Sequence, residues 1–223
     1  MDHSLRLGKL NRSVFAAIAL IAFASFAAIV SDSSSAAVNN SGGLTTNASP
    51  ASKLAPRFGN RTLREGMAGD DVRILKGIAR SNALLSGALT TDFDAQTTDA
   101  VKEFQDSADI SVDGVVDKTT SKSMVQTMKK TEASWYGPGL YGNGVACGGT
   151  LRPGTIGVAH KTLPCGSKVM IGYRGRYLMA KVIDRGPYID GRALDLTYAA
   201  AESLDFIDAG VANVRYAVVN RAK

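Results

Sequence analysis

His160-Lys161-Thr162-Leu163-Pro164-Cys165-Gly166 and Asp184-Arg185-Gly186-Pro187-Tyr188 are the most informative stretches of this chain. They place a histidine, an aspartate and an arginine beside glycine and proline turns. Around them, short runs rich in β-forming residues alternate with turns, at 156–158, 168–173, 177–183 and 214–219. Many short strands separated by such turns are typical of a small β-barrel or sandwich. The second half of the chain is therefore predicted to be all-β, with one helix capped by Thr197.

The segment before this region has a helical pattern. Apolar residues recur at helical spacing after Asp70-Asp71, which we expect to cap a first helix. Second and third helices are predicted from Thr97 to Gln105 and from Thr119 to Met128, and Asp113-Gly114 marks a turn between them.

The amino terminus has the features of an export signal. Three basic residues precede an uncharged apolar run, Val14 to Val30, which small and polar residues follow. We expect residues 1–37 to be a signal peptide cleaved after Ala37, or else a membrane anchor, because the run is nearly long enough to span a bilayer. Residues 38–60 are predicted to be a flexible linker. Both alternatives place the folded part outside the cytoplasm, secreted or associated with the cell wall, which argues against nucleic acid as a partner.

Charge and cysteine content limit the function further. The chain of 223 residues has a net charge of +6 and a pI of about 9.4, which favours anionic partners. The basic excess lies in residues 134–223, which hold eleven Lys/Arg and six Asp/Glu. Cys147 and Cys165 are predicted to form a disulfide, since an isolated pair in an exported protein usually does. A thiol nucleophile is the weaker alternative. Too few ligands remain for a metal site, and no cofactor is expected.

The helical unit, residues 61–130, resembles the three-helix peptidoglycan-binding domain of many wall enzymes. The matching positions are Leu63-Arg64-Glu65-Gly66, Gly69-Asp70-Asp71-Val72, Leu75, Phe93, Thr97, Ala100-Val101, Phe104-Gln105, Asp113-Gly114-Val115 and Thr119. Two positions depart from the pattern: Asp94 stands where a glycine is usual, and Lys76 replaces a common glutamine. The resemblance implies a module that holds the protein on the wall.

Residues 131–223 resemble the rare lipoprotein A (RlpA) family. The matching positions are Ser134-Trp135-Tyr136-Gly137, Gly142-Asn143, Ala146-Cys147-Gly148, Ala159 to Pro164, Gly166, Val169, Asp184 to Tyr188, Gly191-Arg192, Asp195-Leu196 and Ala199-Ala200-Ala201. The resemblance implies a six-stranded double-psi β-barrel, the fold of the expansins. It also implies lytic transglycosylase activity on peptidoglycan, which forms 1,6-anhydro ends and can use one carboxyl group as acid and then base.

The resemblance also implies site residues. Asp184 is the leading acid/base candidate, and the alternative is that it caps the Gly-Pro turn through backbone N–H groups. His160 matches the family's functional histidine and can orient or charge-stabilise a reacting oxygen. Arg185 is expected to orient the reaction and to lower the pKa of Asp184 if the two pair. Asp195 is expected to support the loop.

Gly149 bears on catalysis, because the lytic members carry a glutamate where this chain has glycine. Because this glutamate is absent, two alternatives to the enzyme remain. The first is a noncatalytic, expansin-like protein that binds glycan or loosens the wall, and the second is a barrel that binds other proteins. Trp135, Tyr136, Tyr188 and Lys161 are expected to bind the glycan. The expected partners are glycan strands of peptidoglycan and anionic wall polymers, the latter bound by Lys161, Lys168, Arg174, Arg176, Lys181 and Arg192. Contact with a membrane is expected only through the amino-terminal segment, and the chain is taken as a monomer.

Overall fold

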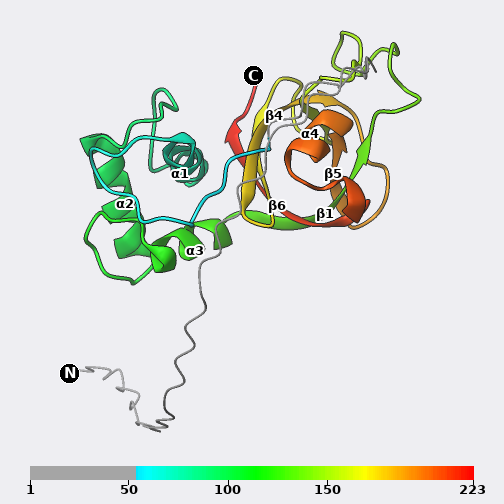
Figure 1. Ribbon diagram of the computed structural model, residues 1–223. Helices are drawn as coiled ribbons and strands as arrows, with labels where there is room; N and C mark the ends of the chain where they lie inside the picture. The colour runs from blue at the N-terminus through cyan, green and yellow to red at the C-terminus, as the bar shows by residue number, and fades with distance from the viewer. Residues whose placement is uncertain (1–53) are drawn as a thin grey trace, which may run out of the picture. The chain divides into compact units, whose positions relative to one another are not determined.

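The computed structural model describes residues 54–223 of the chain, in which three helices precede a closed six-stranded barrel (Figure 1). The fold class predicted from the sequence is confirmed. The predicted signal or anchor and most of the predicted linker lie outside the described residues. Within 54–223, none of the helices has the length and apolar character that crossing a membrane requires.

The three helices are α1 (Asp70–Ser81), α2 (Ala95–Ser107) and α3 (Lys118–Gln126). Asp94 and Asp117 cap α2 and α3, because their side chains accept the N–H groups of Thr97 and Thr120 at 2.8 and 2.7 Å. The expected cap of α1 is wrong: Gly69 occupies the N-cap position and no side chain caps it. Asp71 pairs with Arg61 at 2.6 Å instead.

The barrel strands are ordered β1-β5-β2-β4-β3-β6 around the closed sheet. They are β1 (Lys129–Tyr136), β2 (Gly157–Ala159), β3 (Lys168–Tyr173), β4 (Arg176–Asp184), β5 (Arg192–Thr197) and β6 (Ala212–Asn220). The pairs β1/β5 and β2/β4 are parallel, and the other neighbours are antiparallel. The closed sheet brings β1, β2, β4 and β5 together although they are far apart in the sequence.

A short helix, α4 (Tyr198–Ser203), and a 3-10 turn, Ile207–Ala209, connect β5 to β6. The side chain of Thr197 accepts the N–H of Ala200, so the predicted cap is confirmed. The strands predicted around 156–158, 168–173, 177–183 and 214–219 are all present, with small shifts at their ends. β1 and β5 had not been predicted.

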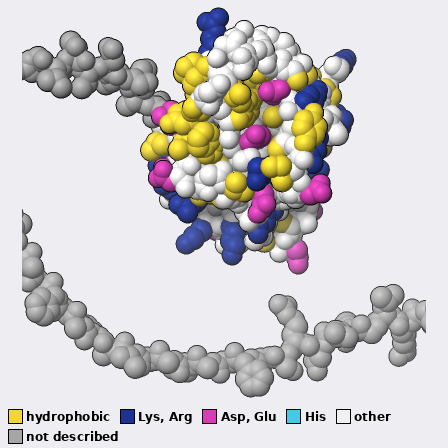
Figure 2. Space-filling model, turned by 90° about the vertical axis from the view of Figure 1, so that its right-hand side faces the viewer, with side chains coloured by type: hydrophobic (Ala, Val, Ile, Leu, Met, Phe, Trp, Pro, Cys, Tyr) yellow, Lys and Arg dark blue, Asp and Glu magenta, His cyan; other side chains and the backbone are white. Residues whose placement is uncertain are grey.

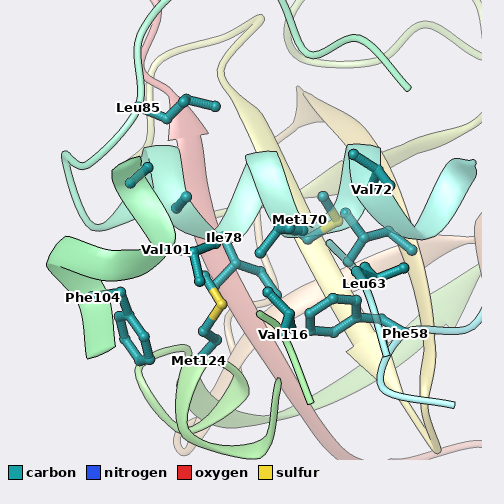
Figure 3. Packing of buried hydrophobic residues seen from close by; sticks show 14 of the residues in the cluster. Phe58, Leu63, Val72, Ile78, Leu85, Val101, Phe104, Val116, Met124 and Met170 are labelled. Carbon is teal, nitrogen blue, oxygen red and sulfur yellow. The ribbon is translucent and has the colours of Figure 1, made fainter. Parts of the chain in front are cut away.

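Side chains of all three helices build one apolar cluster, and barrel residues join it (Figure 3). Leu75, Ile78 and Phe104 are among its helical members. The barrel contributes Met170, Tyr177, Ala217 and Val219. A second cluster fills the barrel, with Val158, Leu194, Leu196 and Phe206 at its centre. Helices and barrel therefore share part of their buried apolar surface.

The two departures from the peptidoglycan-binding pattern contact each other. Lys76 Nζ lies 2.8 Å from Asp94 Oδ2 and 2.8 Å from the hydroxyl of Thr90. The side chain of Lys76 is 3% exposed and that of Asp94 is 49% exposed. The hydrogen bond and charge of Lys76, with hydrogen bonds from Thr97, lower the pKa of Asp94 to about 2. An ion pair thus joins α1 to the cap of α2.

Candidate active site

The strand register brings four residues of the site into one row across the barrel. Ala159 on β2 pairs with Asp184 on one side and with Asp195 on the other. Asp195 in turn pairs with Ser134 on β1. Two strand spacings of about 4.8 Å separate the backbones of the two aspartates by about 10 Å, with only a methyl group between them. The barrel therefore places Asp184 and Asp195 on either side of Ala159 in one row, although the sequence predicted different roles for them.

Asp184 ends β4 and is held by backbone donors. Its Oδ1 accepts the N–H of Ala146 at 2.9 Å and that of Arg185 at 2.8 Å. The alternative expected from the sequence, in which Asp184 accepts backbone N–H groups at the turn, therefore holds for Oδ1. Among the described residues, no hydrogen bond is recorded to Oδ2. The side chain is half-buried, so this second oxygen can face a ligand while the first is fixed.

The carboxyl group of Asp195, which was expected only to support the loop, is largely buried and hydrogen-bonded. Its Oδ1 accepts a hydrogen bond from the Ser134 hydroxyl at 2.6 Å. That hydroxyl in turn accepts one from Arg192 Nη1 at 2.8 Å. Burial raises the pKa of Asp195, the charge of Asp184 adds to the rise, and Ser134 and Arg192 oppose it. A carboxyl group whose pKa is raised keeps its proton to higher pH, as a general acid requires.

Tyr136, at the end of β1, faces both carboxyl groups with its hydroxyl. Burial raises the pKa of this hydroxyl strongly, and the negative charges of Asp184 and then Asp195 raise it further. Within 54–223, the buried Oη has no hydrogen-bond partner that satisfies the usual geometry. An unpaired buried hydroxyl is costly, so it is available to donate to a bound ligand.

His160 follows Ala159 directly, and its ring is fixed in one tautomer. Nδ1 accepts the N–H groups of Thr162 at 3.1 Å and Leu163 at 3.0 Å, which leaves the proton on Nε2. Burial lowers the pKa of His160, and the charges of Arg185 and Lys129 lower it further. The lowered pKa favours the neutral ring at pH 7, in which Nε2 carries an N–H group that no described backbone acceptor occupies.

Arg185 does not pair with the Asp184 carboxylate. Its Nη1 donates to the carbonyl oxygens of His160 at 3.2 Å and Asp184 at 3.4 Å, and its Nη2 lies 3.1 Å from Cys165 Sγ. The expected ion pair is therefore not formed, because the guanidinium is directed along the backbone toward the disulfide. Arg185 instead holds the histidine segment against the end of β4.

The predicted disulfide is present, with the Cα atoms of Cys147 and Cys165 5.4 Å apart. The N–H of Cys147 also donates to the carbonyl of Ile183 at 3.0 Å. The bridge links the loop that carries Ala146, the donor to Asp184, to the turn that follows His160. It thereby ties together the two segments that fix the aspartate and the histidine.

The four residues expected to contact glycan lie in different settings. Trp135 and Tyr136 are adjacent on β1, so their side chains point to opposite faces and cannot stack on the same sugar. The Trp135 ring packs edge-on against Tyr198 at 5.4 Å, and its Nε1 donates to the carbonyl of Ile207. Tyr188, in contrast, is 80% exposed in the loop after Asp184. Lys161 is exposed beside this loop, with Nζ 3.4 Å from the Ile189 carbonyl oxygen.

Gly149 lies on the exposed loop between β1 and β2, with φ of +91°. A Cβ atom built on it would meet nothing within 4 Å. A side chain at this position would have space, but the backbone conformation disfavours any residue with a Cβ atom. Figure 2 shows one face of the molecule, where apolar, acidic and basic side chains are interspersed.

Comparison with known families agrees with this architecture. Residues 128–216 match the family model described as lytic transglycolase, and residues 68–124 match the putative peptidoglycan binding domain. The chain joins a peptidoglycan-binding domain to an RlpA-like barrel. The RlpA-like match covers all six strands except the last residues of β6, and thus every residue of the row described above.

Two relatives are named endolytic peptidoglycan transglycosylase RlpA. That of Campylobacter jejuni is 40% identical over 89 residues, 39% of this chain and 32% of the relative. That of Vibrio cholerae is 41% identical over 90 residues, 40% of this chain and 34% of the relative. The chain thus spans about a third of the length of these relatives. A solved expansin of Clavibacter michiganensis is 23% identical over 43% of this chain and 52% of its own, with a TM-score of 0.35.

Sequence reasoning alone did not find the arrangement of the RlpA-like site. The motif that contains Ser134 indicated no role for this residue, and Asp195 was expected to be structural. Their pairing depends on the β1/β5 register, which joins residues 61 positions apart. Neither β1 nor β5 has an apolar pattern that would have indicated this pairing from the sequence.

Proposed function

We propose that this protein binds peptidoglycan and cleaves its glycan strands as a lytic transglycosylase. The observation that carries the proposal is the pair of carboxyl groups flanking Ala159, with the Tyr136 hydroxyl facing both and with the backbone N–H of His160 donating to the Asp184 carbonyl. The RlpA relatives support the reaction, and the helical domain supports the substrate.

In the proposed reaction, a carboxyl group donates its proton to the glycosidic oxygen as the bond from that oxygen to C1 of N-acetylmuramic acid breaks. The C6 hydroxyl of the same sugar forms a new bond to C1. Its proton passes to the carboxylate, which restores the acid. The products are a 1,6-anhydro end and a free hydroxyl on the leaving sugar, and no water is consumed. One carboxyl group therefore suffices, whereas hydrolysis usually uses two.

The raised pKa favours Asp195 as the group that carries the proton. Asp184, the acid/base candidate from the sequence, contributes the neighbouring negative charge that helps Asp195 to stay protonated. Tyr136 Oη and His160 Nε2 are donors for the oxygen atoms of the sugar at the reaction centre. Arg185 positions the segment of His160 through its carbonyl oxygen.

The exposed Tyr188 ring and the nearby Lys161 ammonium are the proposed glycan contacts outside the row. Tyrosine can stack on a sugar face, and lysine can pair with the carboxylate of N-acetylmuramic acid. Trp135 is instead proposed to hold α4 and the 3-10 turn against β1.

We further propose that the protein acts outside the cytoplasm, since disulfides such as Cys147–Cys165 persist in oxidising compartments. Residues 61–130 and 131–223 are the proposed binding and catalytic domains. Residues 1–37 are the proposed export segment.

Gly149 favours a second candidate, a noncatalytic protein that binds or loosens glycan. The resemblance to lytic RlpA members implies a carboxylate there, which glycine does not supply. The first candidate is preferred because the row of Asp184 and Asp195 is complete without that carboxylate.

The test is mass spectrometry of purified sacculi, with and without their stem peptides, after incubation with the full-length protein. The wild type is expected to release 1,6-anhydro products. Asp195→Asn should lower the rate by about 10²- to 10⁴-fold, the usual contribution of a general acid. Asp184→Asn should shift the alkaline limb of the pH–rate profile to lower pH, because it removes a charge that raises the pKa of Asp195.

Arg221→Gln, an exposed change just after the end of β6, is the matched control and should leave the rate unchanged. If the wild type sediments with sacculi yet releases nothing across the pH range, the noncatalytic candidate holds. If only Asp184→Asn abolishes release, the roles of the two aspartates are reversed.

A further inference from the structure

Two adjoining cavities lie beside α3, away from the row of catalytic candidates. The first, of about 330 Å³, is lined by Lys130, Arg174 and Arg215. The second, of about 260 Å³, is lined by Lys118 and Lys122. Both cavities include Val125 and Tyr177 in their walls, so together they make one groove. We call these two cavities the basic groove.

The secondary structure places all five cations along this groove. Lys118, Lys122 and Val125 follow one another at helical spacing on one face of α3. Lys130 on β1 is the register partner of Arg215 on β6. Arg174 occupies the turn between β3 and β4, at the end of β4 opposite to Asp184. The groove is thus separated from Asp184 by the length of β4, about 26 Å.

The charges of the groove are not balanced by the protein. No Asp or Glu is among the residues that line either cavity. None of the salt bridges within 54–223 involves any of the five cations. Like charges directly opposite each other on paired strands, as Lys130 and Arg215 are, destabilise a sheet. A bound anion would remove this repulsion.

The backbone conformation of Arg174 is also unfavourable for an arginine. Its φ is +44°, and Gly175 follows with φ of +78°. Two-residue hairpin turns of this kind favour Asn, Asp or Gly at the first position. Here an arginine occupies it, with the guanidinium 5.1 Å from the centre of the Tyr173 ring. The turn therefore presents a cation at the groove at some cost in backbone energy.

Arg215 links the groove to the helical domain. Its Nη1 donates to the carbonyl oxygens of Gln126 at 3.3 Å and Met128 at 3.0 Å. The wall of the groove thus contains α3, which belongs to the peptidoglycan-binding region, together with residues of four barrel strands, β1, β3, β4 and β6. An elongated groove with separated cations fits a ligand that carries several anionic groups along its length.

We propose that the basic groove binds the carboxylates of the peptide stems of peptidoglycan and so holds a cross-linked strand while the barrel acts on another. This inference rests on the proposed substrate but not on cleavage. The carboxylate-bearing stems are favoured because the helix that supplies Lys118 and Lys122 lies in the domain matched to peptidoglycan binding, up to residue 124.

The experiment measures cosedimentation of the full-length protein with three preparations of sacculi: intact, stripped of stem peptides by an amidase, and freed of phosphodiester-linked polymers by hydrofluoric acid. The groove variant is Lys118→Gln/Lys122→Gln/Lys130→Gln/Arg174→Gln, which leaves Arg215 to hold the end of α3. The matched control, Lys102→Gln/Arg152→Gln/Arg221→Gln/Lys223→Gln, removes four exposed cations outside the groove.

Wild type and control should bind intact and acid-treated sacculi about tenfold more tightly than the groove variant does, since four exposed charge contacts are lost. This difference should disappear on stripped sacculi and shrink at high salt. The thermal midpoint of the groove variant should be equal to or above that of the control, because like-charge repulsion is removed.

Equal binding of the two variants to intact sacculi overturns the proposal, as does a difference that survives removal of the stems. Loss of the difference only after acid treatment assigns the groove to phosphodiesters and also overturns it. Release of 1,6-anhydro products from stripped strands should be the same for both variants. A protein that binds through the groove but releases nothing would refute the proposed reaction and leave the groove intact.

Discussion

Tyr136 illustrates how a single buried atom can serve function at the expense of stability. Its hydroxyl faces two carboxyl groups and interacts with that of Asp184, but makes no hydrogen bond of good geometry within the described residues. A group left in this state lowers stability unless a ligand completes its bonding. The hydroxyl is therefore a stronger indication of a binding site than the ring that carries it.

Tyr136→Phe should separate these two effects. Removing the unpaired hydroxyl is expected to leave the free energy of unfolding unchanged or to raise it by up to about 1 kcal/mol. Release of 1,6-anhydro products should fall, because a donor to the sugar is lost. Urea denaturation and product analysis on the same preparation check both. A loss of stability without a loss of activity would contradict the assignment.

His160 gives the chain a stability that depends on pH. Its pKa in the folded state is lowered from the usual 6.5, so the folded protein binds fewer protons there than the unfolded chain. The contribution is therefore fully present above about pH 6.5 and is lost as the pH falls toward the folded-state pKa. His160→Asn, whose side-chain oxygen can still accept the two N–H groups, should lack this dependence.

Denaturation of wild type and His160→Asn between pH 5 and pH 8 measures the difference. The wild type should lose stability relative to the variant as the pH is lowered. His160 is the only histidine within 54–223, which makes the comparison direct. Parallel curves for the two proteins would show that the ring is not held neutral.

At the scale of helices and strands, much of the fold follows from local sequence. The helices α1, α2 and α3 were predicted because their apolar residues recur at helical spacing, and β3 and β4 because they are short β-forming runs between turns. β1 was missed because its first half is exposed and carries the charged Lys129, Lys130 and Glu132, so that buried and exposed residues do not alternate along it. β5 was missed because Asp195 interrupts its apolar pattern.

The same limit explains the site. The resemblance to the RlpA family predicted that His160 and Asp184 belong to one site, and their backbones do pair, with the His160 N–H donating to the Asp184 carbonyl at 3.2 Å. The closeness of Asp195 and Tyr136 depends on pairing between strands distant in sequence, which periodicity cannot reveal. The direction of Arg185 depends on the disulfide beside it.

Removing Asp94 from its ion pair with Lys76 is expected to cost more unfolding free energy than removing Lys76. Asp94→Ala leaves the buried ammonium with only the Thr90 hydroxyl and removes the cap of α2. We expect a loss of about 2–3 kcal/mol in unfolding free energy, less than for a fully buried pair because Asp94 is half exposed. Lys76→Met should cost less, since the carboxylate left behind can be solvated.

Urea denaturation of the two single variants and the double variant completes this test as a double-mutant cycle. In the double variant, the loss should be smaller than that of Asp94→Ala alone. A cost for Lys76→Met as large as that for Asp94→Ala would contradict the expected asymmetry, since methionine keeps the packing of the lysine stem and removes only its charge and hydrogen bonds.

At the scale of the whole folded part, helices and barrel share an apolar cluster. Met170, on β3, is 2% exposed and packs among residues of the helical domain. Its neighbour Ile171 is fully buried in the barrel cluster. Because adjacent residues of one strand serve two cores, we expect both domains to unfold in one cooperative transition.

Met170→Ala and Ile171→Ala test this coupling. Each should cost about 2–5 kcal/mol, as large-to-small changes in a core do. Both should lower the midpoint of a single thermal transition seen by calorimetry and by circular dichroism of the helices. Two transitions, with only one moved by each variant, would show that the domains unfold independently.

The bridge between Cys147 and Cys165 makes the geometry of the candidate site depend on the redox state of the compartment. The backbone donor to Asp184 belongs to the residue just before the first cysteine, and the side chain of Arg185 contacts the second. In a reducing cytoplasm the two thiols stay apart, and the segments that they join have no covalent tie. The backbone donor to Asp184 and the contact of Arg185 with Cys165 are therefore covalently tied together only in an oxidising compartment, where the proposed function places the protein.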